Sequence, residues 1–100
     1  MVIGPVDTSN SPIAKLRTLP LDEVSLGEGF WSRRQAVNRQ ASLRHGYEHL
    51  ERAGNFQNLK LATGRVDGEY RGMVFADSDV YKWLEAAAYD LAARPDSDLR

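Results

Sequence analysis

The chain has 100 residues, of which 42% are hydrophobic and 27% charged, and its formal net charge is −1. This composition is typical of one soluble globular domain. The near-neutral charge argues against a nucleic-acid partner, because binding to phosphates needs a clear basic excess. The absence of cysteine excludes a disulfide framework, a thiolate metal site and a cysteine nucleophile within these residues.

The N-terminal part of the chain predicts a leader followed by a strand. Its first residues have neither the basic nor the apolar region of a signal peptide. No apolar run approaches the roughly 20 residues that cross a bilayer, so we expect a cytoplasmic protein with no membrane partner. Residues 1–18, rich in proline, serine and asparagine, predict a flexible leader. Residues 20–26 predict a short β-strand, and Gly27 and Gly29 predict a turn.

Residues 30–52 predict the first long helix. Its apolar positions recur at three-to-four spacing with one polar interruption, in the order Ala36, Gln40, Leu43, Tyr47 and Leu50. Gly46 is expected to weaken this helix by about 1 kcal/mol relative to alanine. The arginines are expected on solvated faces, where their stems cover apolar surface: Arg33, Arg34, Arg39 and Arg44.

Two further helices are predicted. Asn55 is expected to cap a two-turn helix over residues 56–63 that Gly64 ends, and a glycine-interrupted loop follows over residues 64–76. The last helix is predicted over residues 77–94, with a cap from Asp77 or Ser78 and a stop at Pro95.

The last helix has a wide apolar face. Its main stripe is Val80, Leu84, Ala87 and Leu91, and we expect Trp83 and Leu84 to pack inward. A helix that is apolar on most of its circumference is buried on most sides. One other long helix and a strand do not provide enough cover, so the sequence predicts an incomplete, mainly α domain.

Several side chains are candidates for chemistry. Asp77 and Asp79 flank Ser78 beside aromatic residues, so they either line a pocket or serve as a helix cap and a dipole charge. His45 and His49 share a helix face, but a metal needs a third ligand. Three aromatic side chains are expected either to stack on a sugar ring or to pack in the core: Trp31, Tyr81 and Trp83. Two other functions stay open: a small helical protein-interaction module, and a nucleic-acid-binding helix around residues 31–50.

A resemblance extends this interpretation. The stretch GMVFADSDVYKWLEAAAY, residues 72–89, resembles the segment that opens the helical barrel of the glycoside hydrolase family 127 β-L-arabinofuranosidases. Residues 24–34 are similar to the family's leading strand and Phe-Trp pair, and residues 58–64 resemble its next short helix. The resemblance covers residues 19–100.

The resemblance implies a mainly α fold: the opening helices of an (α/α)6 barrel after a short N-terminal strand, with residues 19–100 as the first part of a catalytic domain. It also implies an arabinofuranoside substrate from plant-type glycans, cleaved with retention. Family members use a cysteine nucleophile, a zinc ion held by cysteines and a glutamate, and a second glutamate as acid/base. No position here matches those motifs. We therefore expect no catalytic residue and no cofactor in this chain, zinc in a full-length member, and a substrate-binding role for Asp77 and Asp79.

Overall fold

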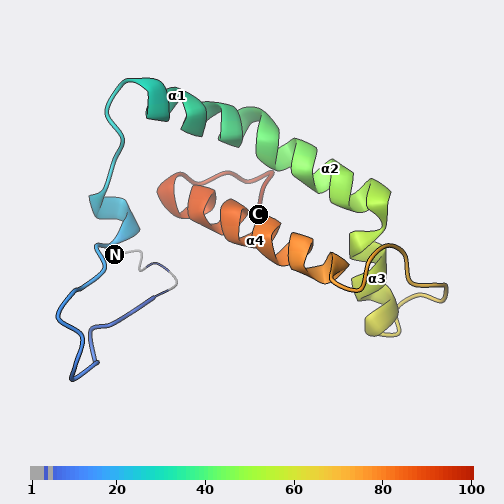
Figure 1. Ribbon diagram of the computed structural model, residues 1–100. Helices are drawn as coiled ribbons and strands as arrows, with labels where there is room; N and C mark the ends of the chain where they lie inside the picture. The colour runs from blue at the N-terminus through green and yellow to red at the C-terminus, as the bar shows by residue number, and fades with distance from the viewer. Residues whose placement is uncertain (1–3, 5) are drawn as a thin grey trace.

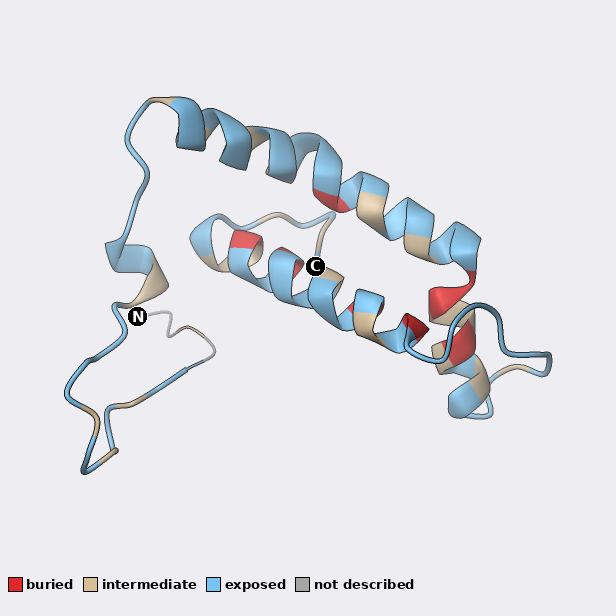
Figure 2. Ribbon diagram, viewed as in Figure 1, coloured by how far each residue is buried: buried red, intermediate tan, exposed pale blue. Residues whose placement is uncertain are grey.

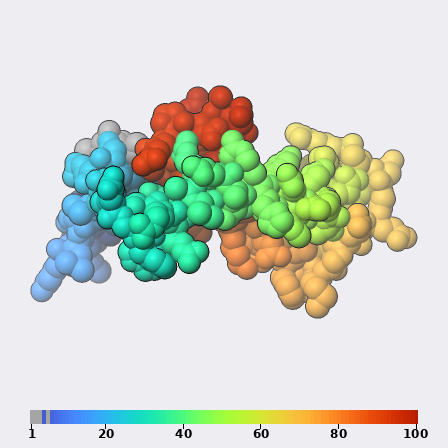
Figure 3. Space-filling view, turned by 90° about the horizontal axis from the view of Figure 1, so that it is seen from above, coloured from blue at the N-terminus to red at the C-terminus, as the bar shows by residue number. Residues whose placement is uncertain are grey.

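The computed structural model describes residue 4 and residues 6–100 (Figure 1). The chain is mainly helical, with a 3-10 turn η1 (Leu21–Glu23), α1 (Phe30–Val37), a π-helical segment η2 (Asn38–Ser42), α2 (Leu43–Ala53), α3 (Asn55–Ala62) and α4 (Ala76–Ala93). Three consecutive elements, α1, η2 and α2, form one long helix that lies beside α4 (Figure 1). From above, the N-terminal segment lies at one end of the long helix, and α3 with the following loop lies at the other (Figure 3).

The predicted β-strand over residues 20–26 does not form, and no described residue belongs to a strand. Instead, the Glu23 N–H donates to the Pro20 carbonyl at 3.1 Å and closes a turn. Val24 and Leu26 are exposed, and Val24 has extended backbone. A strand needs a neighbouring strand for its N–H and C=O groups, but this segment lies beside α4, whose backbone groups bond within the helix. Residues 1–3 and 5, which belong to the predicted leader and to the stretch used to argue against a signal peptide, lie outside the described part of the chain.

The long helix turns a different face towards α4 from the one predicted. Leu43 is buried as expected, but Gln40 is exposed and the neighbouring Arg39 is half-buried. The less exposed positions of this helix include Ala36, Arg39, Leu43, Gly46 and Leu50, which keep three-to-four spacing through η2. The face is shifted by one residue at two positions, because Arg39 pairs with Asp90 and Gly46 lies against Trp83.

Trp83 connects α4 to both α2 and α3. Its indole Nε1 donates to the Leu43 carbonyl at 2.8 Å. Its ring centroid lies 5.5 Å from that of Tyr47 and 6.3 Å from that of Phe56. Gly46 leaves room for this approach, since a Cβ at that position would lie 3.0 Å from Trp83 Cδ1 and the indole would have to shift by a few tenths of an ångström. The predicted inward packing of Trp83 is confirmed, and the glycine that weakens the helix lets the indole pack closely.

Much of the surface of α4 is exposed (Figure 2). Val80 is 1% exposed and Ala87 is buried, but Leu84 is 51% exposed, so its predicted inward packing is wrong. Leu84 lies four residues after Val80 and three before Ala87, so it lies at the edge of the covered face of α4 and stays half-exposed there. The accessible surface is 8101 Å², against about 5,700 Å² for a compact protein of this mass. The radius of gyration is 17.1 Å, against about 13 Å for a compact 100-residue domain.

Arg39 closes the C-terminal end of α4. Its Nη1 lies 2.6 Å from Asp90 Oδ2, and its guanidinium also donates to the carbonyls of Arg94 at 3.1 Å and Pro95 at 3.2 Å. Arg94 is extended, which confirms the predicted stop before Pro95. The prediction of a solvated arginine is therefore wrong for Arg39. A cation at this position also complements the negative end of the helix dipole.

We expect Gly46→Ala to destabilise the fold. The substitution improves helix propensity by about 0.8–1.0 kcal/mol. It also places a methyl group against the Trp83 ring, and overpacking of this kind costs about 1–3 kcal/mol. Chemical denaturation should show a net loss. In a Trp83→Phe background, where the ring is smaller, Gly46→Ala should be less harmful; an equal loss in both backgrounds would contradict the packing argument.

We expect Arg39→Ala to cost about 3 kcal/mol of unfolding free energy. This is the lower end of the range for breaking a buried ion pair, since the Arg39 side chain keeps 20% exposure while that of Asp90 keeps 7%. Arg44→Ala is the matched control: its pair with Asp96 is 3.4 Å long with Arg44 43% exposed, so about 0–1 kcal/mol is expected. Equal losses of unfolding free energy in the two variants would show that the Arg39–Asp90 pair contributes no more than an exposed ion pair.

Candidate functional site

Two buried asparagines of α3 hold the segment that leads into α4. Asn58 Nδ2 donates to the Arg71 carbonyl at 2.7 Å, and the Arg71 N–H donates back to Asn58 Oδ1 at 2.9 Å. Asn55 Nδ2 donates to the Ala76 carbonyl at 2.7 Å. Both asparagines are 7% exposed, and their spacing of three puts them on one side of α3. We refer to Asn55 and Asn58 as the asparagine pair.

Sequence reasoning missed the asparagine pair. It assigned Asn55 as the cap of α3, but no side chain caps this helix, and Gly54, with φ +87°, occupies the cap position. The i, i+3 spacing of two asparagines opposite a glycine-interrupted loop is the signal that could have found the pair. The loop itself, predicted over residues 64–76, is confirmed up to Phe75.

Asp77 and Asp79 both lie exposed in the first turn of α4. The predicted cap from Asp77 or Ser78 is wrong, because α4 already begins at Ala76 and no side chain caps it. Backbone carbonyls of the preceding turn bind the first donors instead: the Ala76 N–H donates to Met73 and the Ser78 N–H to Phe75, both at 3.0 Å.

The two carboxylates do not converge on one point. Residues two apart on an α-helix are rotated by about 200° from each other. Asp79 turns to Lys82, whose Nζ lies 3.4 Å from its Oδ1. Asp77 turns to Tyr81, whose hydroxyl donates a hydrogen bond to it. That hydrogen bond and the charge of Asp77 raise the pKa of the Tyr81 phenol above its ordinary value of 10.0.

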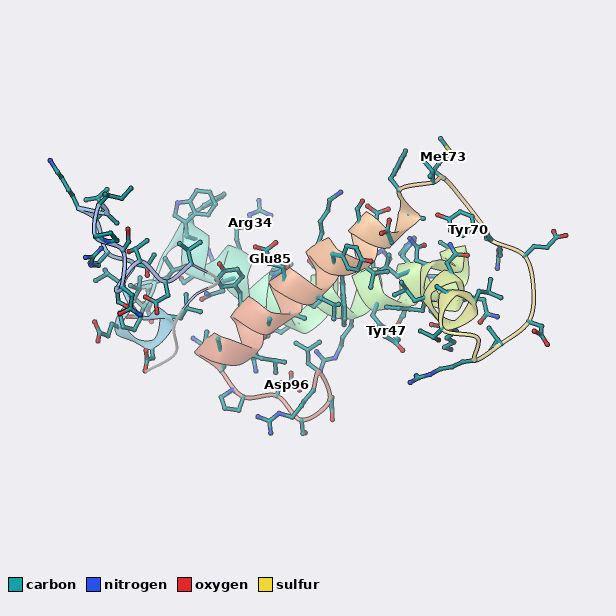
Figure 4. The ribbon with its side chains drawn as sticks, turned by 90° about the horizontal axis from the view of Figure 1, so that it is seen from below. Arg34, Tyr47, Tyr70, Met73, Glu85 and Asp96 are labelled. Carbon is teal, nitrogen blue, oxygen red and sulfur yellow. The ribbon has the colours of Figure 1, made fainter. Side chains whose placement is uncertain are left out.

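Several exposed side chains of mixed chemistry lie in the first turns of α4 and in the loop just before it. We refer to Tyr70, Met73, Phe75, Asp77 and Tyr81, each of which is exposed, as the α4 N-terminal surface. The Tyr70 hydroxyl donates to the Met73 carbonyl, and both side chains lie on the loop just before α4 (Figure 4). Aromatic rings and a carboxylate acceptor together suit a ligand that has apolar faces and hydroxyl groups.

The other candidate aromatic residues lie elsewhere. Trp83 packs between the helices with its N–H already bonded. Trp31 is exposed at the start of α1, where its ring meets that of Phe30 edge to face with centroids 4.9 Å apart. Of the three aromatic side chains suggested by the sequence, only Tyr81 lies next to Asp77.

The histidine pair is close but lacks a third ligand. The rings of His45 and His49 meet edge to face with centroids 4.3 Å apart. Within residue 4 and residues 6–100, no three side chains of the metal-binding types come together. Combined with the absence of cysteine from the sequence, these residues do not fit a zinc site of cysteines and a glutamate.

The sequence matches a family of known proteins. Residues 23–100, most of the chain, match the family described as the β-L-arabinofuranosidase GH127 catalytic domain. The chain belongs to this family. The resemblance predicted from the sequence is confirmed, and with it the chain's assignment to the glycoside hydrolases.

A curated relative gives the same assignment. A 43-residue stretch is 65% identical to the non-reducing end β-L-arabinofuranosidase of Bifidobacterium longum subsp. longum. That stretch is 43% of this chain and 6% of the relative, so the chain spans a small part of the length of the curated relative that it matches. No solved structure matches this chain. No helix in the described part of the chain is long and apolar enough to cross a membrane, and the cytoplasmic location stays a prediction.

We expect Asp77→Asn to lower the pKa of Tyr81 towards its ordinary value of 10.0. The neutral phenol is the donor, so the contact stabilises the fold below that value and is lost as the pH rises through the raised pKa. The measurement is the ultraviolet absorbance of tyrosinate against pH, with Tyr81→Phe to identify the transition. Asp79→Asn is the control and should leave this transition unchanged; an unchanged transition in Asp77→Asn would contradict the contact.

Proposed function

We propose that residues 23–100 are the opening part of a catalytic domain that releases β-L-arabinofuranose from plant-type glycans with retention of configuration. The observation that supports this most strongly is the match of these residues to the GH127 catalytic domain. The similarity to the Bifidobacterium protein, a non-reducing end β-L-arabinofuranosidase, supports the same substrate class.

In this proposal the segment supplies part of the substrate pocket and no reacting group. Retaining hydrolysis needs two groups on opposite sides of the scissile bond, a nucleophile and an acid/base. The two carboxylates in the first turn of α4 point to different sides, and Asp79 turns to Lys82. The zinc and the cysteine nucleophile that the resemblance implies would be held by other residues of a complete family member, because the donor set here does not suit them.

Asp77 is the residue we propose to contact the sugar. Its carboxylate is exposed beside the Tyr81 phenol, so it has free oxygen lone pairs for sugar hydroxyl groups. Phe75 and Tyr81 offer apolar faces close by in the sequence. Asp79, the second predicted site residue, would act through its charge near the pocket wall.

A helical protein-interaction module remains the second candidate. The observation that favours it is the exposure of two large side chains of α4, Tyr81 and Leu84. Exposed apolar side chains of this kind are also expected if further elements of a complete catalytic domain cover them.

The experiment uses a catalytic domain that contains this segment and an aryl β-L-arabinofuranoside. We expect hydrolysis in which the sugar is first released as the β-anomer. Nuclear magnetic resonance spectra recorded before mutarotation identify this anomer. Asp77→Asn should raise KM and change kcat less than about tenfold, because a residue that binds but does not transfer protons contributes little to the chemical step. Its stability cost should be about 0.3–1 kcal/mol through the lost dipole interaction.

Asp79→Asn is the control, with a similar stability cost and a smaller change in KM. A rate loss above about a hundredfold in Asp77→Asn at unchanged melting temperature would make Asp77 a reacting group. Absence of hydrolysis by the intact domain would refute the arabinofuranosidase proposal and favour the interaction module.

A further inference from the structure

We propose that Asn55 and Asn58 are positioning residues for the substrate, which hold the α4 N-terminal surface in its binding shape. This inference rests on the proposed function, because it assumes that this surface contacts the furanoside. The two asparagines do not touch the surface's outer side themselves. They act through the backbone of residues 71–76.

The segment that they hold has little other support. Between Gly64 and Phe75 the chain has turns and bends but no regular element, and Gly72 sits at φ +90°. Met73 and Phe75 are more than half exposed, and Val74 is 90% exposed. With so few buried side chains, a segment of this kind opens locally at small cost unless polar contacts fix it.

The contacts are specific to asparagine. Asn58 uses its NH₂ as a donor and its carbonyl as an acceptor against the C=O and N–H of one residue, Arg71. An aspartate in the same place has no N–H to donate, and an aliphatic side chain has neither group. Asn58 therefore binds the Arg71 backbone much as a neighbouring strand would, and its burial makes an unpaired amide costly.

The two fixed points lie on either side of the exposed residues. Arg71 is held before Met73 and Phe75, and Ala76 is held immediately after them. Asp77 follows the second fixed point by one residue, so its direction depends on how α4 begins. If the segment opens, only a fraction of molecules has a competent surface, and the apparent affinity falls by that fraction.

The test is a kinetic comparison of Asn55→Ala and Asn58→Ala in a catalytic domain that contains this segment, with an aryl β-L-arabinofuranoside. We expect KM to rise about tenfold, as it does when the competent fraction falls to about a tenth, with kcat per folded molecule unchanged. A merely structural role gives the opposite pattern, because loss of folded enzyme lowers the apparent kcat and leaves KM alone. That result would overturn the proposal.

Two further variants keep the outcome decisive. Asn58→Asp keeps the acceptor for the Arg71 N–H but sets a buried carboxylate oxygen against the Arg71 carbonyl, so KM should rise at least as much as in Asn58→Ala. Asn55→Ala carries the test if Asn58→Ala does not fold. Asn38→Ala removes an exposed asparagine of η2 and should leave KM unchanged. Hydrogen exchange of the Arg71 amide should speed up in Asn58→Ala and not in Asn38→Ala.

Phe75→Ala and Asp77→Asn separate this inference from the function on which it rests. If neither variant changes KM, the α4 N-terminal surface does not contact the furanoside and the proposed site fails. If both change KM but the asparagine variants do not, the surface binds the sugar and only the positioning role is wrong.

Discussion

The arrangement of the helices depends on the close packing of Trp83 against Gly46. The missing side chain at Gly46 lets the indole reach the Leu43 carbonyl, which sets the distance between α4 and the long helix. At that distance Leu43, Val80 and Ala87 become buried between the two helices. The same ring meets Tyr47 and Phe56, so it also fixes α3, and aromatic pairs of this kind contribute about 0.5–1.5 kcal/mol each beyond their buried area.

Polar contacts then fix the two ends of α4. At its C-terminal end Arg39 binds Asp90 and two backbone carbonyls, where a cation also suits the helix dipole. At its N-terminal end Asn55 binds the Ala76 carbonyl. Beyond the face that these contacts hold, Tyr81 and Leu84 stay exposed on α4.

This division of α4 suits the first part of a GH127 catalytic domain. The buried face of α4, with Val80 and Ala87, joins the helices to each other. Exposed Tyr81 and Leu84 and the α4 N-terminal surface are available for substrate or for further helices. The proposed activity needs a nucleophile and an acid/base that this segment does not supply. Its contribution, in our proposal, is the shape of one pocket wall, which the asparagine pair maintains.

The sequence by itself determined the helices, the stop at Pro95 and the family. These features depend on local periodicity, on the fixed geometry of proline and on a motif over residues 72–89, all of which are readable along the chain. Tertiary structure decided the inward turn of Arg39, the role of Gly46, the binding of backbone by Asn55 and Asn58, and the exposure of Leu84. Each of these depends on which segments distant in sequence come together. The predicted strand failed for the same reason, since a strand forms only where another segment can bond to it.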